Sequence, residues 1–140
     1  MKGLKIKPGD EVITTAHSWI STSQTITQAG GKVVFCDTDE DTFTIDVEQI
    51  ESKITDKTVG IIPVHLFGQP AQMDRVMEIA KKHNLWVLED CAQAHGAKYK
   101  GNPVGSIGHI GCWSFCQDKI MTTGGEGGMV TTDNESLWRK

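Results

Sequence analysis

The residues best suited to chemistry follow an apolar run that ends at Leu88. Glu89 and Asp90 come directly after this run, and Gln93 and His95 lie within the next five positions. A carboxylate at the end of a strand can bind a metal, act as a base, cap the following turn or pair with a cationic ring nitrogen. A metal site is the weakest of these, because only Glu89 and His95 lie close together and no common ligand spacing is met.

Lys119 is the second candidate. It follows an apolar run and precedes the glycine-rich segment 124–128. An amine that is partly desolvated at such a position is free to form an imine with an aldehyde. Ser114, five residues earlier, has a hydroxyl suited to a phosphate, and the glycines let the backbone approach a bound ring. A lysine after a strand can equally be an ordinary solvated surface residue.

These residues have to be positioned by a fold in which short apolar runs alternate with helical stretches. That alternation predicts an α/β fold with a mostly parallel sheet flanked by helices, in which ligands bind at the carboxyl ends of the strands. Strands are expected over 11–15, 32–36, 58–64, 85–88, 110–115 and 129–132. Helices are expected over 19–29 with Ser18 as the N-cap and Gly30 and Gly31 at the end, from Asp46 through Ile54, after Pro70, and from about 133 onward.

Composition and charge indicate one globular domain in the cytoplasm. The 140 residues are 38% hydrophobic and 23% charged, and no segment approaches the roughly 20 apolar residues of a membrane span. A net charge of −4 argues against a nucleic-acid surface. The four cysteines form no Cys-x-x-Cys pair, so we expect free and largely buried thiols in a reducing compartment.

Several ordered motifs, spread over essentially the whole chain, resemble the DegT/StrS-type sugar aminotransferases. The motifs are Gly9-Asp10-Glu11-Val12-Ile13, the stretch 61–70, Asp90 with Ala92-Gln93-Ala94-His95-Gly96, Ser114-Phe115-x-x-x-Lys119, and Gly124-Gly125-Glu126-Gly127-Gly128. The family consists of pyridoxal-phosphate enzymes of the aspartate-aminotransferase (type I) fold. The resemblance implies that residues 1–140 are a partial cofactor-binding large domain, without the upstream turn and helix or the small C-terminal domain.

The resemblance also implies a role for each candidate residue. Lys119 would hold pyridoxal phosphate as a Schiff base and then move protons, so it is the catalytic residue. Asp90 would pair with the pyridinium nitrogen, and Trp19 would stack on the ring. Gln93 would contact the ring near its phenolic oxygen, and Ser114 would contact the phosphate. No metal is expected, and Glu126 has no assigned role.

The implied function is transfer of an amino group from an amino acid to a nucleotide-linked keto-sugar, as in polysaccharide biosynthesis. Relatives that are dehydratases carry histidine in place of the lysine, so Lys119 favours aminotransfer. The family's sites form between two subunits, so we expect a homodimer or other self-association, and weak or no turnover by this short chain. No nucleic-acid or membrane partner is expected.

Two alternatives remain at this point. The chain could be a catalytically inert fragment or a non-enzymatic module that retains the fold. It could also be a doubly wound nucleotide-binding domain that uses segment 124–128 as a phosphate loop. This second alternative is weak, because the segment precedes a strand and not a helix N-terminus.

Overall fold

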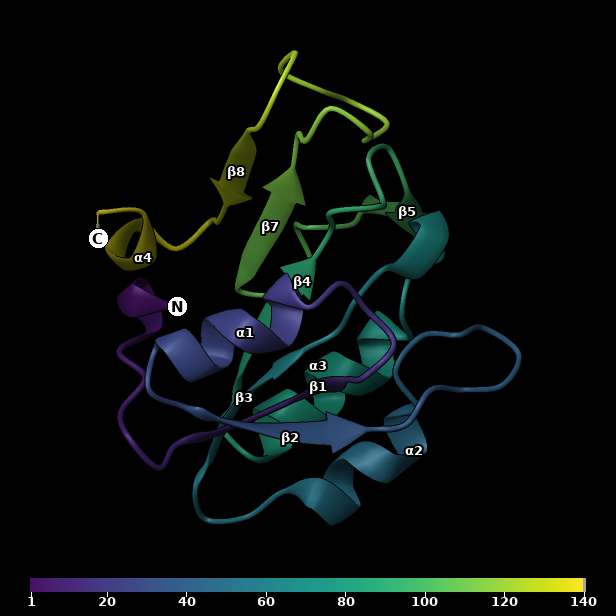
Figure 1. The fold of residues 1–140 in the computed structure, drawn as a ribbon. Coiled ribbons are helices and arrows are strands. Elements are labelled where there is room, and N and C mark those ends of the chain that lie inside the picture. Colours follow the sequence, from purple (N-terminus) through teal and green to yellow (C-terminus); the bar gives the residue numbers. More distant parts are fainter. Residues whose placement is uncertain (140) are drawn as a thin grey trace.

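A computed structural model describes residues 1–139, apart from the side chain of residue 2. Its centre is a six-stranded sheet in the order β2-β1-β3-β4-β7-β8 (Figure 1). The first five strands in this order run parallel, and β8 pairs antiparallel with β7. The mostly parallel α/β architecture expected from the sequence is therefore confirmed. The strands are β1 (Glu11–Thr15), β2 (Lys32–Cys36), β3 (Thr58–Ile62), β4 (Trp86–Asp90), β7 (Ile110–Ser114) and β8 (Gly128–Thr131), with a separate small hairpin of β5 (Lys98–Tyr99) and β6 (Asn102–Pro103).

Helices lie on both faces of this sheet. The apolar residues of α2 and α3 share one buried cluster with the sheet, and Ile26 of α1 belongs to a second cluster on the other face. The α-helices are α1 (Ser21–Gln28), α2 (Val47–Ile50), α3 (Met73–Lys82) and α4 (Glu135–Trp138), and short 3-10 helices span Lys2–Leu4, Glu51–Lys53 and Leu66–Gly68. The helix expected after Pro70 is thus confirmed as α3, which buries Met73, Val76, Ile79 and Ala80.

Consecutive residues of each strand point to opposite faces of the sheet. On β4, Val87 belongs to the cluster with α2 and α3, whereas Leu88 belongs to the cluster with α1. The alternation continues to the end of the strand. Glu89 therefore points to the α3 face, and Asp90 points to the α1 face. The two adjacent carboxylates lie in different environments for this reason.

The start of α1 differs from the sequence prediction. The helix begins at Ser21, and Ile20 occupies the cap position without a capping side chain, so the prediction of Ser18 as N-cap was wrong. The Ser18 hydroxyl instead pairs with the Thr22 hydroxyl at 2.8 Å. Trp19 consequently lies in the segment that precedes the helix. The expected end is confirmed, because Gly30 follows the helix with a φ of +92° that favours glycine.

Other boundaries also moved. Asp46 caps α2 as expected, accepting a hydrogen bond from the backbone N–H of Glu48, but the helix changes to 3-10 geometry at Glu51. Strand β3 ends at Ile62, two residues earlier than expected, because Pro63 has no N–H for the ladder. The Pro63 carbonyl still accepts a hydrogen bond from the N–H of Asp90 at 2.9 Å.

The thiols follow the expectation in part. All four cysteines are free; Cys36 and Cys91 are buried, whereas Cys112 and Cys116 are only partly buried. Within residues 1–139, no helix combines the length and apolar character needed to cross a bilayer.

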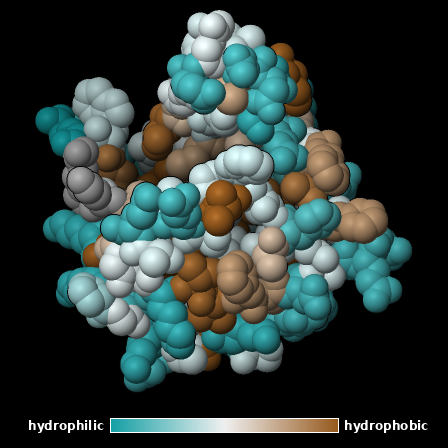
Figure 2. Space-filling model, viewed as in Figure 1, coloured by the Kyte–Doolittle hydropathy of each residue, from teal (hydrophilic) through white to brown (hydrophobic). Residues whose placement is uncertain are grey.

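The α1 face of the sheet is hollowed beyond α1. Figure 2 shows this hollow, with hydrophobic residues at its floor, between α1 and the β7–β8 hairpin. A groove of about 320 Å³ lies on this face between the N-terminal segment, β8 and α4, and its lining includes Leu88, Ile110, Cys112, Val130 and Leu137. Apolar surface on this face is therefore only partly covered by the described residues.

Candidate active site

A pocket of about 390 Å³ lies at the carboxyl edge of the sheet. The five residues identified from the sequence as site candidates all line it: Trp19, Asp90, Gln93, Ser114 and Lys119. They come from the segment before α1, the end of β4, the loop after β4, the end of β7 and the β7–β8 connection. Residues that are far apart in the sequence thus meet at one place because parallel strands end at the same edge.

Asp90 is held from two sides. Its Oδ2 accepts a hydrogen bond of 2.7 Å from the Thr22 hydroxyl on α1, and its Oδ1 accepts one of 3.1 Å from the backbone N–H of Ala92. The side chain is partly buried and borders the pocket. A carboxylate fixed in this way is suited to pair with a cationic group of a ligand. Thr22 was not among the residues identified from the sequence, where its only signal was its position one turn after Ser18.

Gln93 is oriented by the turn that follows β3. The backbone N–H of Phe67 donates to Gln93 Oε1 at 2.9 Å, which leaves the NH2 group as the end available to a ligand. Phe67 itself adopts a left-handed conformation, with φ of +54°. The turn thus determines which end of the Gln93 amide can donate into the pocket.

Lys119 lies on the loop between β7 and β8. The base of this loop is closed by a hydrogen bond of 2.7 Å from the N–H of Phe115 to the carbonyl of Gly127, and the N–H of Lys119 donates to the carbonyl of Cys116. Lys119 is partly buried. Ser114 lies at the end of β7, where its Oγ accepts from the N–H of Cys116 at 3.4 Å. The amine and the hydroxyl therefore border the same pocket from one continuous segment.

The rim of the pocket includes groups that the sequence left without a role. The Cys116 thiol donates to Glu126 Oε1 at 3.1 Å, and this carboxylate, with Asp118, raises the pKa of the Cys116 thiol. Cys116 is therefore held in the thiol form beside Lys119. Trp19 is 73% exposed, so its ring is available to pack against a flat ligand.

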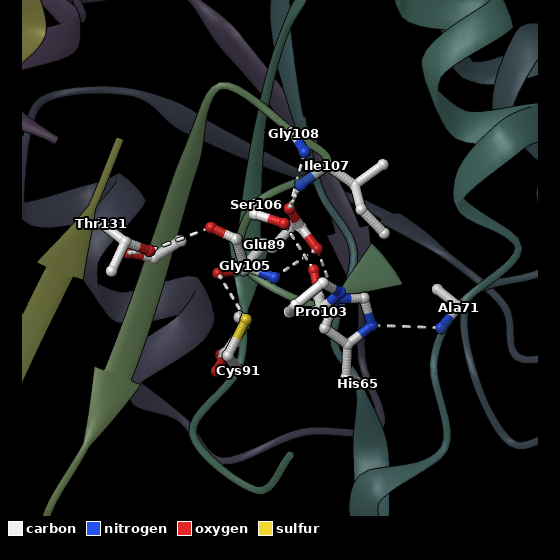
Figure 3. A network of polar contacts seen from close by, with 12 residues as sticks. His65, Ala71, Glu89, Cys91, Pro103, Gly105, Ser106, Ile107, Gly108 and Thr131 are labelled. Atoms are coloured by element: carbon white, nitrogen blue, oxygen red, sulfur yellow. Dashed lines mark hydrogen bonds and ion pairs between the residues drawn. The ribbon is translucent and has the colours of Figure 1, made fainter. Parts of the chain in front are cut away.

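Glu89 and His95, two of the strand-end candidates, do not line this pocket. Glu89 is fully buried on the α3 face and contacts His65 Nε2 at 2.9 Å (Figure 3). His95 packs beside Trp113 and Phe115, with ring centroids 5.4 and 5.6 Å away. The residues of this stretch that border the pocket are Asp90, Ala92 and Gln93.

The donor atoms of His65, Glu89 and Cys91 lie within 4.8 Å of one another, close enough for a metal ion. The chemistry of the donors does not favour one. Both His65 ring nitrogens and both Glu89 oxygens already take part in hydrogen bonds with protein groups. Burial, together with the charges of Glu89 and Asp90, raises the pKa of the Cys91 thiol far above its usual range, which disfavours the thiolate that binds metals.

The pocket fits pyridoxal phosphate by the types of group it presents. An amine can react with the aldehyde of this cofactor, and a carboxylate can pair with its ring nitrogen. An amide donor suits the phenolic oxygen, a hydroxyl suits the phosphate, and an exposed indole suits the ring face. The glycine-rich segment 124–128 leads into β8, which pairs with β7, and therefore does not present a helix N-terminus to a nucleotide phosphate.

Comparisons with known proteins indicate the family and its cofactor. A model of the DegT/DnrJ/EryC1/StrS aminotransferase family matches residues 1–140. The UDP-N-acetyl-3-dehydro-alpha-D-glucosamine 3-aminotransferase of Acidithiobacillus ferrooxidans is 46% identical, over the whole chain and 38% of that protein. The solved aminotransferase from Psychrobacter cryohalolentis is 60% identical with a TM-score of 0.97, over 99% of this chain and 35% of the other.

A further solved structure bears on the cofactor. NtdA of Bacillus subtilis, solved with bound cofactor PMP, is 36% identical with a TM-score of 0.89, over 97% of this chain and 30% of the other. Aminotransferases of this family use pyridoxal phosphate. The chain spans about a third of the length of the relatives it matches. Because the family model matches the whole chain and the fold agrees with a solved aminotransferase at 60% identity, the chain belongs to the DegT/DnrJ/EryC1/StrS aminotransferase family.

Proposed function

We propose that this chain forms the pyridoxal-phosphate pocket of an aminotransferase that acts on a nucleotide-linked keto-sugar with an amino acid as donor. The observation that carries the proposal is the convergence of Lys119, Asp90 and Trp19 on one pocket at the carboxyl edge of the sheet. An amine, a carboxylate and an exposed indole from three distant segments are the set that this cofactor requires.

Each residue has a distinct task in this proposal. When bound, pyridoxal phosphate supplies the aldehyde and the electron-withdrawing ring through which an amino group passes from donor to acceptor. The Nζ of Lys119 would bind the cofactor covalently in the resting state and, once free of it, would move a proton. Asp90 pairs with the protonated ring nitrogen, and the Thr22 hydroxyl holds the carboxylate in place.

The remaining residues orient the ligand. Trp19 covers one ring face, the NH2 of Gln93 donates to the phenolic oxygen, and the hydroxyl of Ser114 donates to the phosphate. The choice of a nucleotide-linked sugar as acceptor is supported by the name of the Acidithiobacillus relative, which is 46% identical.

The proposal extends to the setting of the reaction. All four cysteines are free, as a reducing compartment keeps them, so we place the protein in the cytoplasm. We further propose that the chain works as part of a large domain, because it spans about a third of its relatives' length. We propose a homodimer because the apolar groove on the α1 face is only partly covered. Turnover by this chain alone is then weak or absent.

The first experiment is addition of pyridoxal phosphate to the purified protein, followed by the visible spectrum, borohydride reduction and peptide mapping. We expect a single stable adduct, located on Lys119. Lys119→Ala should abolish this adduct, whereas Lys81→Ala on the exposed surface of α3 should leave it unchanged. Adducts distributed over several lysines in both variants would refute the assignment of the pocket.

A second measurement separates an enzyme from an inert fragment. The protein is incubated with pyridoxal phosphate, glutamate and a nucleotide-linked keto-sugar, and the amino-sugar product is measured. We expect little or no product from this chain even where the Lys119 adduct forms. Efficient turnover would contradict the proposed need for the remainder of the enzyme, while leaving the cofactor pocket in place.

A further inference from the structure

A buried carboxylate lies on the opposite side of β4 from the pocket. Glu89 and His65 are both 0% exposed, and His65 Nε2 contacts Glu89 Oε2 at 2.9 Å (Figure 3). The other ring nitrogen, Nδ1, accepts a hydrogen bond from the backbone N–H of Ala71 at 3.1 Å. Because Nδ1 is an acceptor, the proton of the ring is on Nε2, and His65 is a neutral donor to a charged Glu89.

Three further donors complete the shell of Glu89. Gly105 N–H donates to Oε2 at 2.8 Å, while the N–H groups of Ile107 and Gly108 donate to Oε1 at 2.8 and 2.6 Å. Each carboxylate oxygen therefore accepts two hydrogen bonds. Burial by itself raises the pKa of Glu89, but the hydrogen bonds from His65, Gly108 and Gly105 outweigh it and hold the pKa below its usual value.

The network reaches the pocket through the turn after β3. The backbone N–H of His65 donates to the carbonyl of Asp90 at 3.0 Å, which ties the network to the strand end that carries this carboxylate. Two residues after His65, the N–H of Phe67 holds Gln93 Oε1 in its left-handed turn. The placement of the Gln93 amide thus depends on a turn that begins at His65, the hydrogen-bond partner of Glu89.

A second branch reaches β7. The carbonyl of Gly105 accepts a hydrogen bond of 2.9 Å from the Thr131 hydroxyl on β8, and that hydroxyl accepts one from Trp113 Nε1 at 3.1 Å. Trp113 directly precedes Ser114 on β7. Gly105 has a φ of +79°, and a Cβ there would come within 2.5 Å of the Trp113 ring, so the loop fits closely against this strand.

We propose that Glu89, acting with neutral His65, is a positioning residue for the pocket: it sets the relative placement of the segments that carry Asp90, Gln93 and Ser114. This inference rests on the proposed function and adds residues that do not themselves touch the cofactor. The Glu89 carboxylate accepts four hydrogen bonds. These bonds join β4 to the turn at His65 and to the loop 105–108, which are separate segments of the sequence.

Glu89→Gln tests the proposal because the shape is kept, whereas two of the four hydrogen bonds that the carboxylate accepts are lost. In either orientation of the new amide, its NH2 group replaces an oxygen that accepts two N–H donors, and it cannot accept either. The matched control is Glu11→Gln. Glu11 is 6% exposed and accepts from Lys32 and Thr55, but it lies at the amino end of β1, at the edge of the sheet away from the pocket.

Three quantities are measured for each variant: the free energy of unfolding in urea, the Kd for pyridoxal phosphate, and the hydrogen-exchange rate of the Phe67 backbone amide without cofactor. We expect Glu89→Gln to weaken cofactor binding at least tenfold and to accelerate Phe67 exchange at least tenfold. Glu11→Gln should change the Kd and the Phe67 exchange rate by no more than about twofold, even where it lowers the free energy of unfolding as much as Glu89→Gln does. Equal effects of the two variants on binding and exchange would overturn the proposal.

His65 variants provide an independent check where Glu89→Gln does not fold. His65→Gln retains an N–H donor for Glu89, whereas His65→Leu removes it, so cofactor affinity should decline from wild type to His65→Gln to His65→Leu. Equal affinity in the two His65 variants would contradict the role of the donor. If the wild-type protein does not bind pyridoxal phosphate, the proposed function fails, and Phe67 exchange in the same variants still decides whether Glu89 positions the turn.

Discussion

At the scale of single residues, the partners of Asp90 are as informative as Asp90 itself. Its carboxylate is oriented by the Thr22 hydroxyl and by the N–H of Ala92, so it faces the pocket in a defined geometry. Hydrogen bonds to charged groups contribute about 1.5–3 kcal/mol. Loss of the Thr22 hydroxyl should therefore be visible in cofactor binding without removing any group that touches the cofactor.

We expect Thr22→Val to weaken binding of pyridoxal phosphate roughly tenfold, which corresponds to about 1.4 kcal/mol. The measurement is titration of the cofactor followed by absorbance. Thr25→Val is the control, because Thr25 lies on the same helix and donates only to the carbonyl of Thr22. A comparable loss in the two variants would show that the hydroxyl of Thr22 has no particular role toward Asp90.

At the scale of elements, helices on the two faces of the sheet should separate stability from binding. Helix α2 packs on the face opposite α1, and Asp46 caps it by accepting from the N–H of Glu48 at 3.0 Å and from Gln49 Nε2 at 2.7 Å. Removal of an N-cap side chain costs typically about 1 kcal/mol. No residue of α2 lines the pocket, so loss of the cap should lower the free energy of unfolding and leave cofactor binding unchanged.

Asp46→Ala is accordingly expected to lower the free energy of unfolding by about 1 kcal/mol and to leave the Kd for pyridoxal phosphate within about twofold. Urea denaturation and cofactor titration measure the two effects. Asp56→Ala, at an exposed turn position before β3, removes the same charge without a cap and should change neither quantity. A large change in Kd for Asp46→Ala would contradict the separation of the two faces.

At the scale of the whole molecule, carboxylates with lowered pKa values make the fold sensitive to acid. Hydrogen bonds from Lys82 and His83 lower the pKa of Glu51 to about 2. Hydrogen bonds from Lys100 and Tyr99 lower the pKa of Asp74 to about 2. Both groups are exposed, so solvent screens their effect. The pKa of Glu89 is also below its usual value, because its hydrogen bonds outweigh the upward effect of burial.

Groups with lowered pKa contribute stability that is complete above their unfolded pKa, about 4.3 for glutamate, and that is lost as the pH falls through the folded value. We expect the free energy of unfolding to vary little through these groups between about pH 7 and pH 5, and to decline below about pH 4. Glu89→Gln should lower the plateau and make the decline shallower. A pH profile of Glu89→Gln parallel to that of the wild type would contradict the contribution of Glu89.

The apolar surface on the α1 face is only partly covered, so we expect copies of this chain to associate. The groove lined by Leu88, Ile110, Cys112, Val130 and Leu137 is apolar, and Trp138, which also lines it, is 74% exposed. Contiguous apolar patches of several hundred Å² favour contact with other surfaces. We expect the average mass measured by light scattering to rise with protein concentration. A constant monomer mass over a wide concentration range would contradict this expectation.

Much of the architecture could be anticipated from local patterns. Short runs rich in β-branched and apolar residues predicted β1 and β2 with correct bounds, and helical periodicity predicted the buried face of α3. Both signals depend only on neighbours in the chain. The order of motifs identified the family and named five candidate residues. The cap of α1 was predicted wrongly, because the Ser18 hydroxyl pairs with a side chain and not with the helix backbone.

Asp90 lines the pocket and Glu89 is buried behind it, and this difference depends on contacts that no local pattern contains. Adjacent carboxylates at a strand end look equivalent in the sequence. The alternation along β4 places them on opposite faces, but only the covering elements decide which face carries the pocket. Those elements bring Thr22 to Asp90 across 68 positions of sequence and His65 to Glu89 across 24. Side-chain chemistry and periodicity are local properties, whereas strand order and helix placement decide which groups meet, and the pocket and its buried support arise from that placement.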